Sequence, residues 1–148
     1  MAPIAEEVLK FFKSHNLESI TDFQKLPKSG GDRIYFRIVT DKNSYIATYD
    51  ENIRESETFL YFTSHFSKTK APVPEIYFSS EDKRMYIQKD FGPVSLLNEL
   101  EKYGENEYVY SLFQKSLNAL ASLQIKGFKK LDYSYCLTSK EFGKQAIL

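Results

Sequence analysis

Residues that commonly hold metals or form disulfides are few in this chain. The only histidines are His15 and His65, and the only cysteine is Cys136. Their spacing matches no metal-ligand set, so we expect no metal site built from these side chains. A single cysteine cannot form an internal disulfide, which is typical of a protein in a reducing cytoplasm.

One acidic residue lies in an unusual context. Residues from about Ile53 to Phe66 show helical periodicity, and Glu57 shares a face with Leu60 and Tyr61. A carboxylate on a partly apolar helix face needs a cationic partner, or it lies at a solvated rim. Both interpretations remain open from the residues alone.

The elements around this helix are indicated by local patterns. Arg33–Thr40 alternates apolar and polar residues, as a half-buried strand does, and the turn-forming residues 41–43 connect it to a second strand at Ser44–Tyr49. Before this hairpin, the glycine pair at 30–31 predicts a flexible loop. Asn52 predicts a helix cap, with Glu55 as its reciprocal capping partner.

The same reasoning assigns the rest of the chain. We expect helices from Pro3 to about Asn16, over Ser95–Leu100, over Asn106–Lys126 and from Thr138, and strands at Asp22–Leu26, Glu75–Ser79 and Met85–Lys89. The long helix carries an apolar stripe that predicts burial, formed by Leu112, Phe113, Leu117, Leu120 and Leu123.

Composition limits the class of protein. The chain has 148 residues, with 42% hydrophobic and 27% charged, which is typical of a globular fold and not of a disordered one. Its 20 basic and 20 acidic residues cancel, so no excess of positive charge favours nucleic-acid binding. No apolar run approaches the ~18 residues of a membrane span.

Five short motifs in a fixed order resemble the aminoglycoside phosphotransferase and choline kinase superfamily, which has a protein-kinase-like fold. Within it, the similarity is greatest to bacterial small-molecule kinases of the N-acetylmuramate or N-acetylglucosamine type. The motifs are D-R-I-Y-F-R at 32–37, E-S-E-T-F-L-Y-F at 55–62, P-V-P-E-I at 72–76, M-Y-I-Q-K-D-F-G at 85–92 and S-L-L-N-E-L at 95–100.

The resemblance implies an α+β fold: a kinase-like amino-terminal lobe with a five-stranded antiparallel sheet and one inserted helix, followed by the first large-lobe helices. It divides the chain into an amino-terminal helix at 1–20, a nucleotide-binding small lobe at 21–92 and a helical region at 93–148. Because the sequence ends on three apolar residues, we expect this region to stop before the catalytic loop.

The resemblance also implies sites for ATP. The loop from Ser29 through Gly30 and Gly31 would cover the phosphates, and Glu57 would orient a phosphate-binding cation. The segment Gln88, Lys89 and Asp90 would bind adenine through its backbone. Ile46, Ala47 and Ile87 would line the adenine slot, although a role in the core explains these three equally well.

Two departures from the family pattern stand out. No lysine occurs between Asn43 and Ser67, so the third strand has Thr48 and Tyr49 where the phosphate-binding lysine belongs. Arg37 or Arg33 is then the substitute, or the phosphates are held by metal and backbone alone.

The second departure concerns catalysis. No H-x-D catalytic loop is present, and Asp132 is the only aspartate after Asp90, so no catalytic residue and no metal ligand is assigned. The D-F-G at 90–92 ends a hairpin and is not the metal-binding D-F-G of protein kinases.

Three hypotheses follow. The first is the amino-terminal part of a cytoplasmic ATP- and Mg²⁺-dependent phosphotransferase for a hydroxyl of a sugar, amino sugar or aminoglycoside-like acceptor. This chain would be inactive alone, with its Mg²⁺ ligands in the carboxyl-terminal lobe. The second is a stand-alone module without nucleotide binding that covers its apolar helical surface by self-association or a partner. The third is an unrelated α+β domain. None involves nucleic acid or a membrane.

Overall fold

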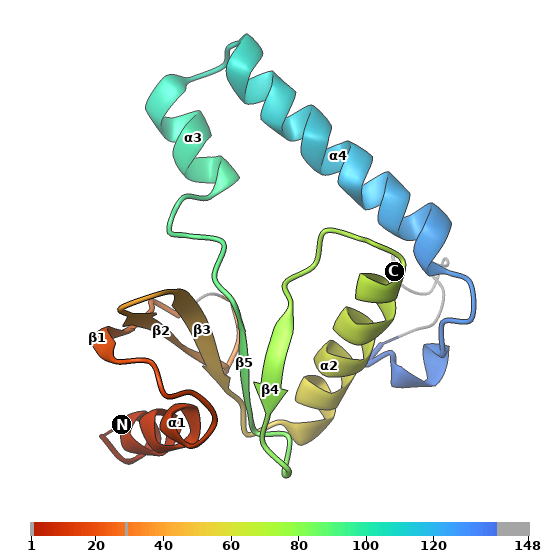
Figure 1. Ribbon diagram of the computed structural model, residues 1–148. Helices are drawn as coiled ribbons and strands as arrows, with labels where there is room; N and C mark the ends of the chain where they lie inside the picture. The colour runs from red at the N-terminus through yellow and green to blue at the C-terminus, as the bar shows by residue number, and fades with distance from the viewer. Residues whose placement is uncertain (1, 29, 139–148) are drawn as a thin grey trace.

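A five-stranded sheet with helices on both of its faces forms the body of the protein (Figure 1). The computed structural model describes residues 2–28 and 30–138, so the helix expected from Thr138 lies outside the described residues. In order, the described elements are α1 Ala2–His15, β1 Ile20–Lys25, β2 Ile34–Thr40, β3 Ser44–Tyr49, α2 Ile53–Lys68, β4 Ile76–Ser79, β5 Met85–Lys89, α3 Leu96–Tyr103, α4 Glu107–Gly127 and a 3₁₀ turn η1 Tyr133–Tyr135.

The sheet is antiparallel throughout, in the order β1-β2-β3-β5-β4. The central strand β3 lies between β2 and β5, and α2 is inserted between β3 and β4. The predicted α+β class, the five antiparallel strands and the inserted helix are therefore confirmed.

One face of the sheet is apolar because alternate residues of each strand point to the same side. Phe36 of β2, Ala47 of β3 and Ile87 of β5 are paired across the strands and are all buried. Helix α1 covers this face with Val8 and Phe12, which are 1% and 0% exposed. This contact forms the hydrophobic core.

The other face is partly covered by α2. The ring of Phe59 on α2 stacks on Tyr86 of β5 with centroids 5.1 Å apart. The segment that contains η1 docks on the far side of α2, where the Tyr61 and Tyr135 rings stack at 4.0 Å and the Thr58 hydroxyl donates to the Tyr135 carbonyl at 2.8 Å. Helix α2 therefore joins the sheet to the carboxyl-terminal segment.

Helix α4 is much more exposed than its sequence predicts. It meets α3 near its start and α2 near its end, where Nε2 of His65 lies 2.7 Å from the Gly127 carbonyl oxygen (Figure 1). Between these ends, Leu117 and Leu120 are 64% and 50% exposed, and Phe113 is exposed as well. The prediction of a buried stripe is wrong because no described element packs along the middle of α4.

The contact between α1 and the sheet is testable by mutation. Phe12→Ala leaves a cavity in the core and is expected to lower the free energy of unfolding by about 3–5 kcal/mol. Urea unfolding followed by far-UV circular dichroism measures this. Leu17→Ala is the control, because Leu17 is fully exposed, and it should change stability by less than about 0.5 kcal/mol. Equal effects of the two substitutions would show that α1 does not cover the sheet in solution.

Candidate functional site

The sheet face opposite α1 brings together residues from three strands. Arg37, Ile46 and Gln88 are register partners across β2, β3 and β5, so their side chains share this face. The Gln88 side-chain oxygen Oε1 is buried and accepts no hydrogen bond from any described residue. On this face, the Ile46 side chain offers an apolar contact beside Gln88 Oε1, a buried acceptor without a described donor.

Ala47 does not belong to this group. It is 1% exposed and packs in the core under α1, with Ile87 as its register partner. The prediction that Ala47 and Ile87 line the same slot as Ile46 is therefore wrong, since successive residues of a strand point to opposite faces. Their alternative assignment to the core is the one observed.

Arg37 is held by a carboxylate at the end of β5. Its Nε and Nη2 atoms donate to Asp90 Oδ2 and Oδ1 at 2.7 and 3.1 Å. Ser44 Oγ also donates to Asp90 Oδ2, at 2.6 Å, and the Gly92 N–H donates to Oδ1 at 2.8 Å. This clamp fixes the segment that leaves the sheet toward α3, and it occupies one edge of the Arg37 guanidinium.

These donors determine the ionisation of Asp90. Burial alone would raise the pKa of this carboxyl, whose side chain is 4% exposed. The hydrogen bonds from Arg37, Ser44 and the Gly92 N–H outweigh burial and lower the pKa below its usual value. Asp90 is therefore a structural carboxylate, ionised at neutral pH.

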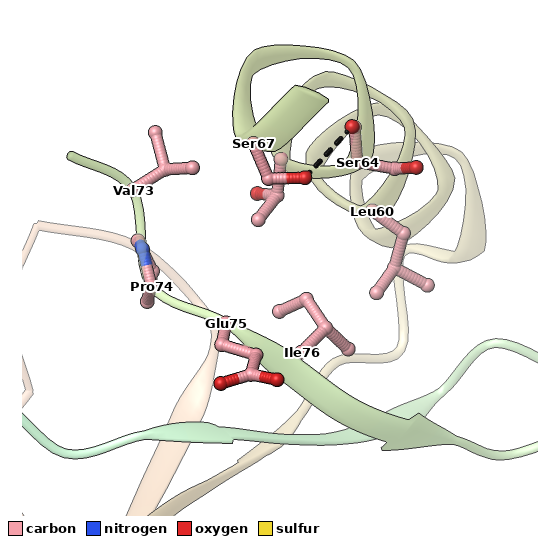
Figure 2. A pocket seen from close by; sticks show the side chains of 8 residues that line it. Leu60, Ser64, Ser67, Val73, Pro74, Glu75 and Ile76 are labelled. Carbon is pink, nitrogen blue, oxygen red and sulfur yellow. Dashed lines mark hydrogen bonds between the residues drawn. The ribbon is translucent and has the colours of Figure 1, made fainter. Parts of the chain in front are cut away.

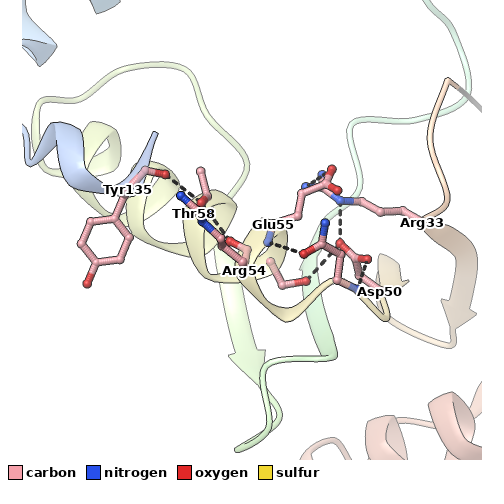
Figure 3. A network of polar contacts seen from close by, with 8 residues as sticks. Arg33, Asp50, Arg54, Glu55, Thr58 and Tyr135 are labelled. Atoms are coloured by element: carbon pink, nitrogen blue, oxygen red, sulfur yellow. Dashed lines mark hydrogen bonds and ion pairs between the residues drawn. The ribbon is translucent and has the colours of Figure 1, made fainter. Parts of the chain in front are cut away.

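A second cation, Arg33, lies between two carboxylates at the start of α2 (Figure 3). Its Nε donates to Asp50 Oδ2 at 3.1 Å, and its Nη2 lies 2.8 Å from Glu55 Oε1. Its Cζ atom also lies 5.4 Å from the centre of the Phe59 ring, at cation–π distance. Arg33 thus joins the segment that follows the glycine loop to the inserted helix.

The capping of α2 differs in one respect from its prediction. The Asn52 side chain accepts from the Glu55 N–H at 3.3 Å, so Asn52 is the predicted cap. The Glu55 carboxylate, however, pairs with Arg33 and not with the Asn52 backbone; the Asn52 N–H donates to Asp50 Oδ1 at 2.8 Å. The reciprocal half of the capping box is therefore wrong, because two charged groups offer a stronger interaction.

Glu57 is not the helix glutamate that pairs with a cation. It is exposed and makes no ion pair or hydrogen bond with any residue in the described part of the chain. Of its two interpretations, the solvated rim position is the one observed. The α2 glutamate that pairs with a cation is Glu55, two residues earlier.

Thr48 and Tyr49, the two residues considered for the phosphate-binding position of the third strand, lie on opposite faces of the sheet. Thr48 is paired with Tyr86 and faces α2, whereas Tyr49 faces α1 in the core. Thr48 is fully buried beside Tyr86, and burial raises the pKa of Tyr86 to about 12. Arg33 is the cation that pairs with α2, through Glu55.

The other residues predicted to bind ATP lie in the glycine loop and at the end of β5. Gly30 has a positive φ of 68°, which favours glycine, and Gly31 is exposed beside it; Ser29 lies outside the described residues. The Lys89 side chain is exposed, and its backbone N–H donates to the Glu75 carbonyl at 2.9 Å. That N–H is used within the sheet edge and does not face a ligand.

Comparisons with known proteins add no family. A scan against protein-family models found no match, and a search of curated proteins found none either. Across residues 2–28 and 30–138, no cluster of three acidic, histidine or cysteine residues could hold a metal ion. None of the helices described is long and apolar enough to cross a membrane.

Sequence reasoning assigned no role to Asp50, which organises the site. Asp50 directly follows a strand and precedes the cap Asn52 by two residues, a pattern in which a carboxylate bonds the following backbone. That local signal was present. Its pairing with Arg33, 17 residues earlier, depends on the fold and has no local signal.

The Asp90 clamp predicts a specific pH dependence. Because its folded-state pKa is lowered, Asp90 contributes stability that is fully present above the unfolded pKa of about 3.9 and is lost as pH falls through the folded pKa. Asp90→Asn should lower the free energy of unfolding by about 3 kcal/mol at pH 7, and this difference from wild type should become smaller below about pH 4.

Urea unfolding of both proteins at several pH values measures the difference. Glu81→Gln, an exposed acid on the β4–β5 turn, is the control and should match wild type at each pH. If Asp90→Asn lowered the free energy of unfolding by the same amount from pH 7 to pH 3, the proposed contribution of the ionised Asp90 carboxylate would be contradicted.

Proposed function

We propose that this chain is the amino-terminal, nucleotide-binding part of an ATP-dependent phosphotransferase that acts on a hydroxyl of a small molecule. The observation that carries the proposal is the sheet order β1-β2-β3-β5-β4 with a helix inserted after β3, joined to the sheet by the Arg33–Glu55 ion pair. This arrangement resembles the small lobe of the protein-kinase-like fold. There, a cation paired with a helix glutamate contacts the phosphates.

In this proposal, adenine lies on the sheet face that carries Ile46 and Gln88, next to the backbone of residues 88–90. The phosphates extend toward Gly30, Gly31 and Arg33. With Asp50 and Glu55, Arg33 forms a cluster of one positive and two negative charges, which does not favour a polyanion by itself. Mg²⁺ bound to the phosphates supplies the missing positive charge.

The chain itself is expected to bind nucleotide without transferring phosphate. Its sequence lacks the H-x-D loop whose aspartate positions the acceptor hydroxyl. We therefore assign acceptor binding, Mg²⁺ ligation by protein and hydroxyl activation to a carboxyl-terminal lobe, with a sugar, amino sugar or aminoglycoside-like acceptor.

A second candidate is an interaction module of the same fold without nucleotide binding. Two observations favour it. The Arg37 guanidinium is engaged by Asp90, and the exposed Phe113, Leu117 and Leu120 on α4 suit burial by a second copy or another partner. The two functions differ in one measurable property, which is affinity for ATP.

Thermal unfolding with ATP and Mg²⁺ tests the proposal. At an ATP concentration ten times Kd, binding to the folded chain alone adds about 1.4 kcal/mol to its free energy of unfolding. This raises the midpoint by about 3–6 °C for a chain of this size. Arg33→Gln should abolish the rise, because it removes the charge near the phosphates, whereas Arg33→Lys should keep part of it.

Arg84→Gln is the matched control, since the Arg84 side chain is 44% exposed and pairs only weakly with Asp82, at 3.8 Å. Each variant is compared with itself without nucleotide, which separates binding from stability. No rise in wild type at millimolar ATP, or the same rise in Arg33→Gln, would contradict the proposed site. Phosphoryl transfer by the pure chain would contradict the assignment of catalysis to another lobe.

A further inference from the structure

We propose that one exposed face of α4 is the interface of a homodimer, in which the α4 helices of two copies pair antiparallel. This face, which we call the α4 seam, consists of Tyr110, Phe113, Leu117, Leu120 and Gln124. It shares no residue with the nucleotide surface proposed above, so the inference does not depend on that function.

The molecule exposes more surface than a compact monomer of its size. Its accessible surface is 10549 Å², whereas a compact monomer of 17.3 kDa exposes about 7,800 Å². Residues 1, 29 and 139–148, which are not described, contribute at most about 2,000 Å² even when given the exposure of an unfolded chain. At least about 1,000 Å² of excess therefore belongs to the described residues, and one side of a stable protein–protein interface buries about 800 Å².

The excess is concentrated on the helices that follow the sheet. Eight of the 17 large hydrophobic residues that are exposed in the described chain lie on α3 and α4. Helix α4 contacts α3 near its start and α2 near its end, and Figure 1 shows no element alongside its middle among those described. The area available for an interface therefore lies mainly on this arm of the molecule.

Helix α2 shows how a covered helix is arranged in the same molecule. Its Leu60 faces Ile76 of β4 across a hollow (Figure 2), and its Phe59 ring stacks on Tyr86 of β5 with centroids 5.1 Å apart. Within the described part of the chain, no element offers the α4 seam such neighbours. A second molecule can provide them.

The spacing of the α4 seam is that of a helix that packs lengthwise against another helix. Its members lie alternately three and four residues apart, at 110, 113, 117, 120 and 124, which is the 3.5-residue repeat of coiled coils. A crossing at a steep angle would cover only one or two of these residues. A partner helix laid along α4 covers all of them.

Charge favours a second copy of α4 as that partner. Between positions 109 and 125 the only charged residue is Lys115. It lies two residues from both Phe113 and Leu117, on the opposite side of the helix. Two copies of the seam can thus meet without like-charge repulsion. The same lack of basic residues beside the seam disfavours an anionic membrane surface.

An antiparallel pair also matches the two ends of the seam. With Leu117 on the twofold axis, Phe113 of one copy packs against Leu120 of the other. Tyr110 then faces Gln124 at each end, where the hydroxyl and the amide can form a hydrogen bond. A parallel pair would bring the two Gln124 amides together and align the helix dipoles in the same direction, which is less favourable.

Sedimentation velocity of the full chain at concentrations of about 1–100 µM tests the proposal, because interfaces of this size bind with micromolar or tighter affinity. We expect a dimer with twice the chain mass of 17.3 kDa. A chain that stays monomeric at about 100 µM would overturn the proposal, since the seam would then belong to a different partner. A species larger than a dimer would overturn it as well.

A matched pair of substitutions locates the interface. Leu117→Glu should raise the dissociation constant of the dimer at least about 30-fold, because two like charges would meet at the twofold axis. Ile125→Glu is the control: Ile125 is exposed on the same helix but lies outside the seam, so this variant should dimerise as wild type does. A dimer that survives Leu117→Glu, or that the control weakens equally, would overturn the proposal.

Mixing two variants tests the register. Leu117→Glu and Leu117→Lys should each be monomeric, yet their equimolar mixture should dimerise, because opposite charges then face each other at the axis. Both side chains replace an exposed leucine, so the folded chain accommodates them. A mixture that stays monomeric would overturn the twofold arrangement, since Leu117 would then not face its own copy.

Discussion

The arrangement of the candidate site depends on the buried carboxylate of Asp50. Its side chain is 2% exposed and accepts hydrogen bonds from Arg33 Nε, from the Asn52 N–H and from the Ser56 hydroxyl. A carboxylate removed from water is stable only when such partners surround it. This requirement ties the start of β2 and the end of β3 to the first turn of α2. Arg33 and Glu55 are thereby placed together at the junction of loop, sheet and helix.

The two faces of the sheet differ in how they are covered. One face is apolar and closed by α1, so its residues build the core. The other carries Arg37, Ile46 and Gln88, and α2 covers only part of it. The clamp of Asp90 on Arg37 and Ser44 holds the chain where it leaves this second face for α3. A ligand on this face would therefore contact side chains that are held in place and whose charged groups are already paired.

The sequence predicts the elements well because their signals are local. Alternation defines β2, and Asn52 caps α2 as expected. The pairings within the site are long-range and were not predictable: Asp90 clamps Arg37 from 53 residues away, and Arg33 selects Glu55 over Glu57. The exposure of the α4 stripe was not predicted either. Apolar periodicity shows which face of a helix is suited to burial, but it does not show whether another element packs against that face.

The central claim is that the second face of the sheet holds a nucleotide. Amide shift mapping of the ¹⁵N-labelled chain with ATP and Mg²⁺ tests it most directly. The account predicts saturable changes concentrated in residues 30–37, 46–48 and 86–92, with none in α1, because α1 lies on the opposite face. Changes that map to α1, or no change at millimolar ATP, would contradict it.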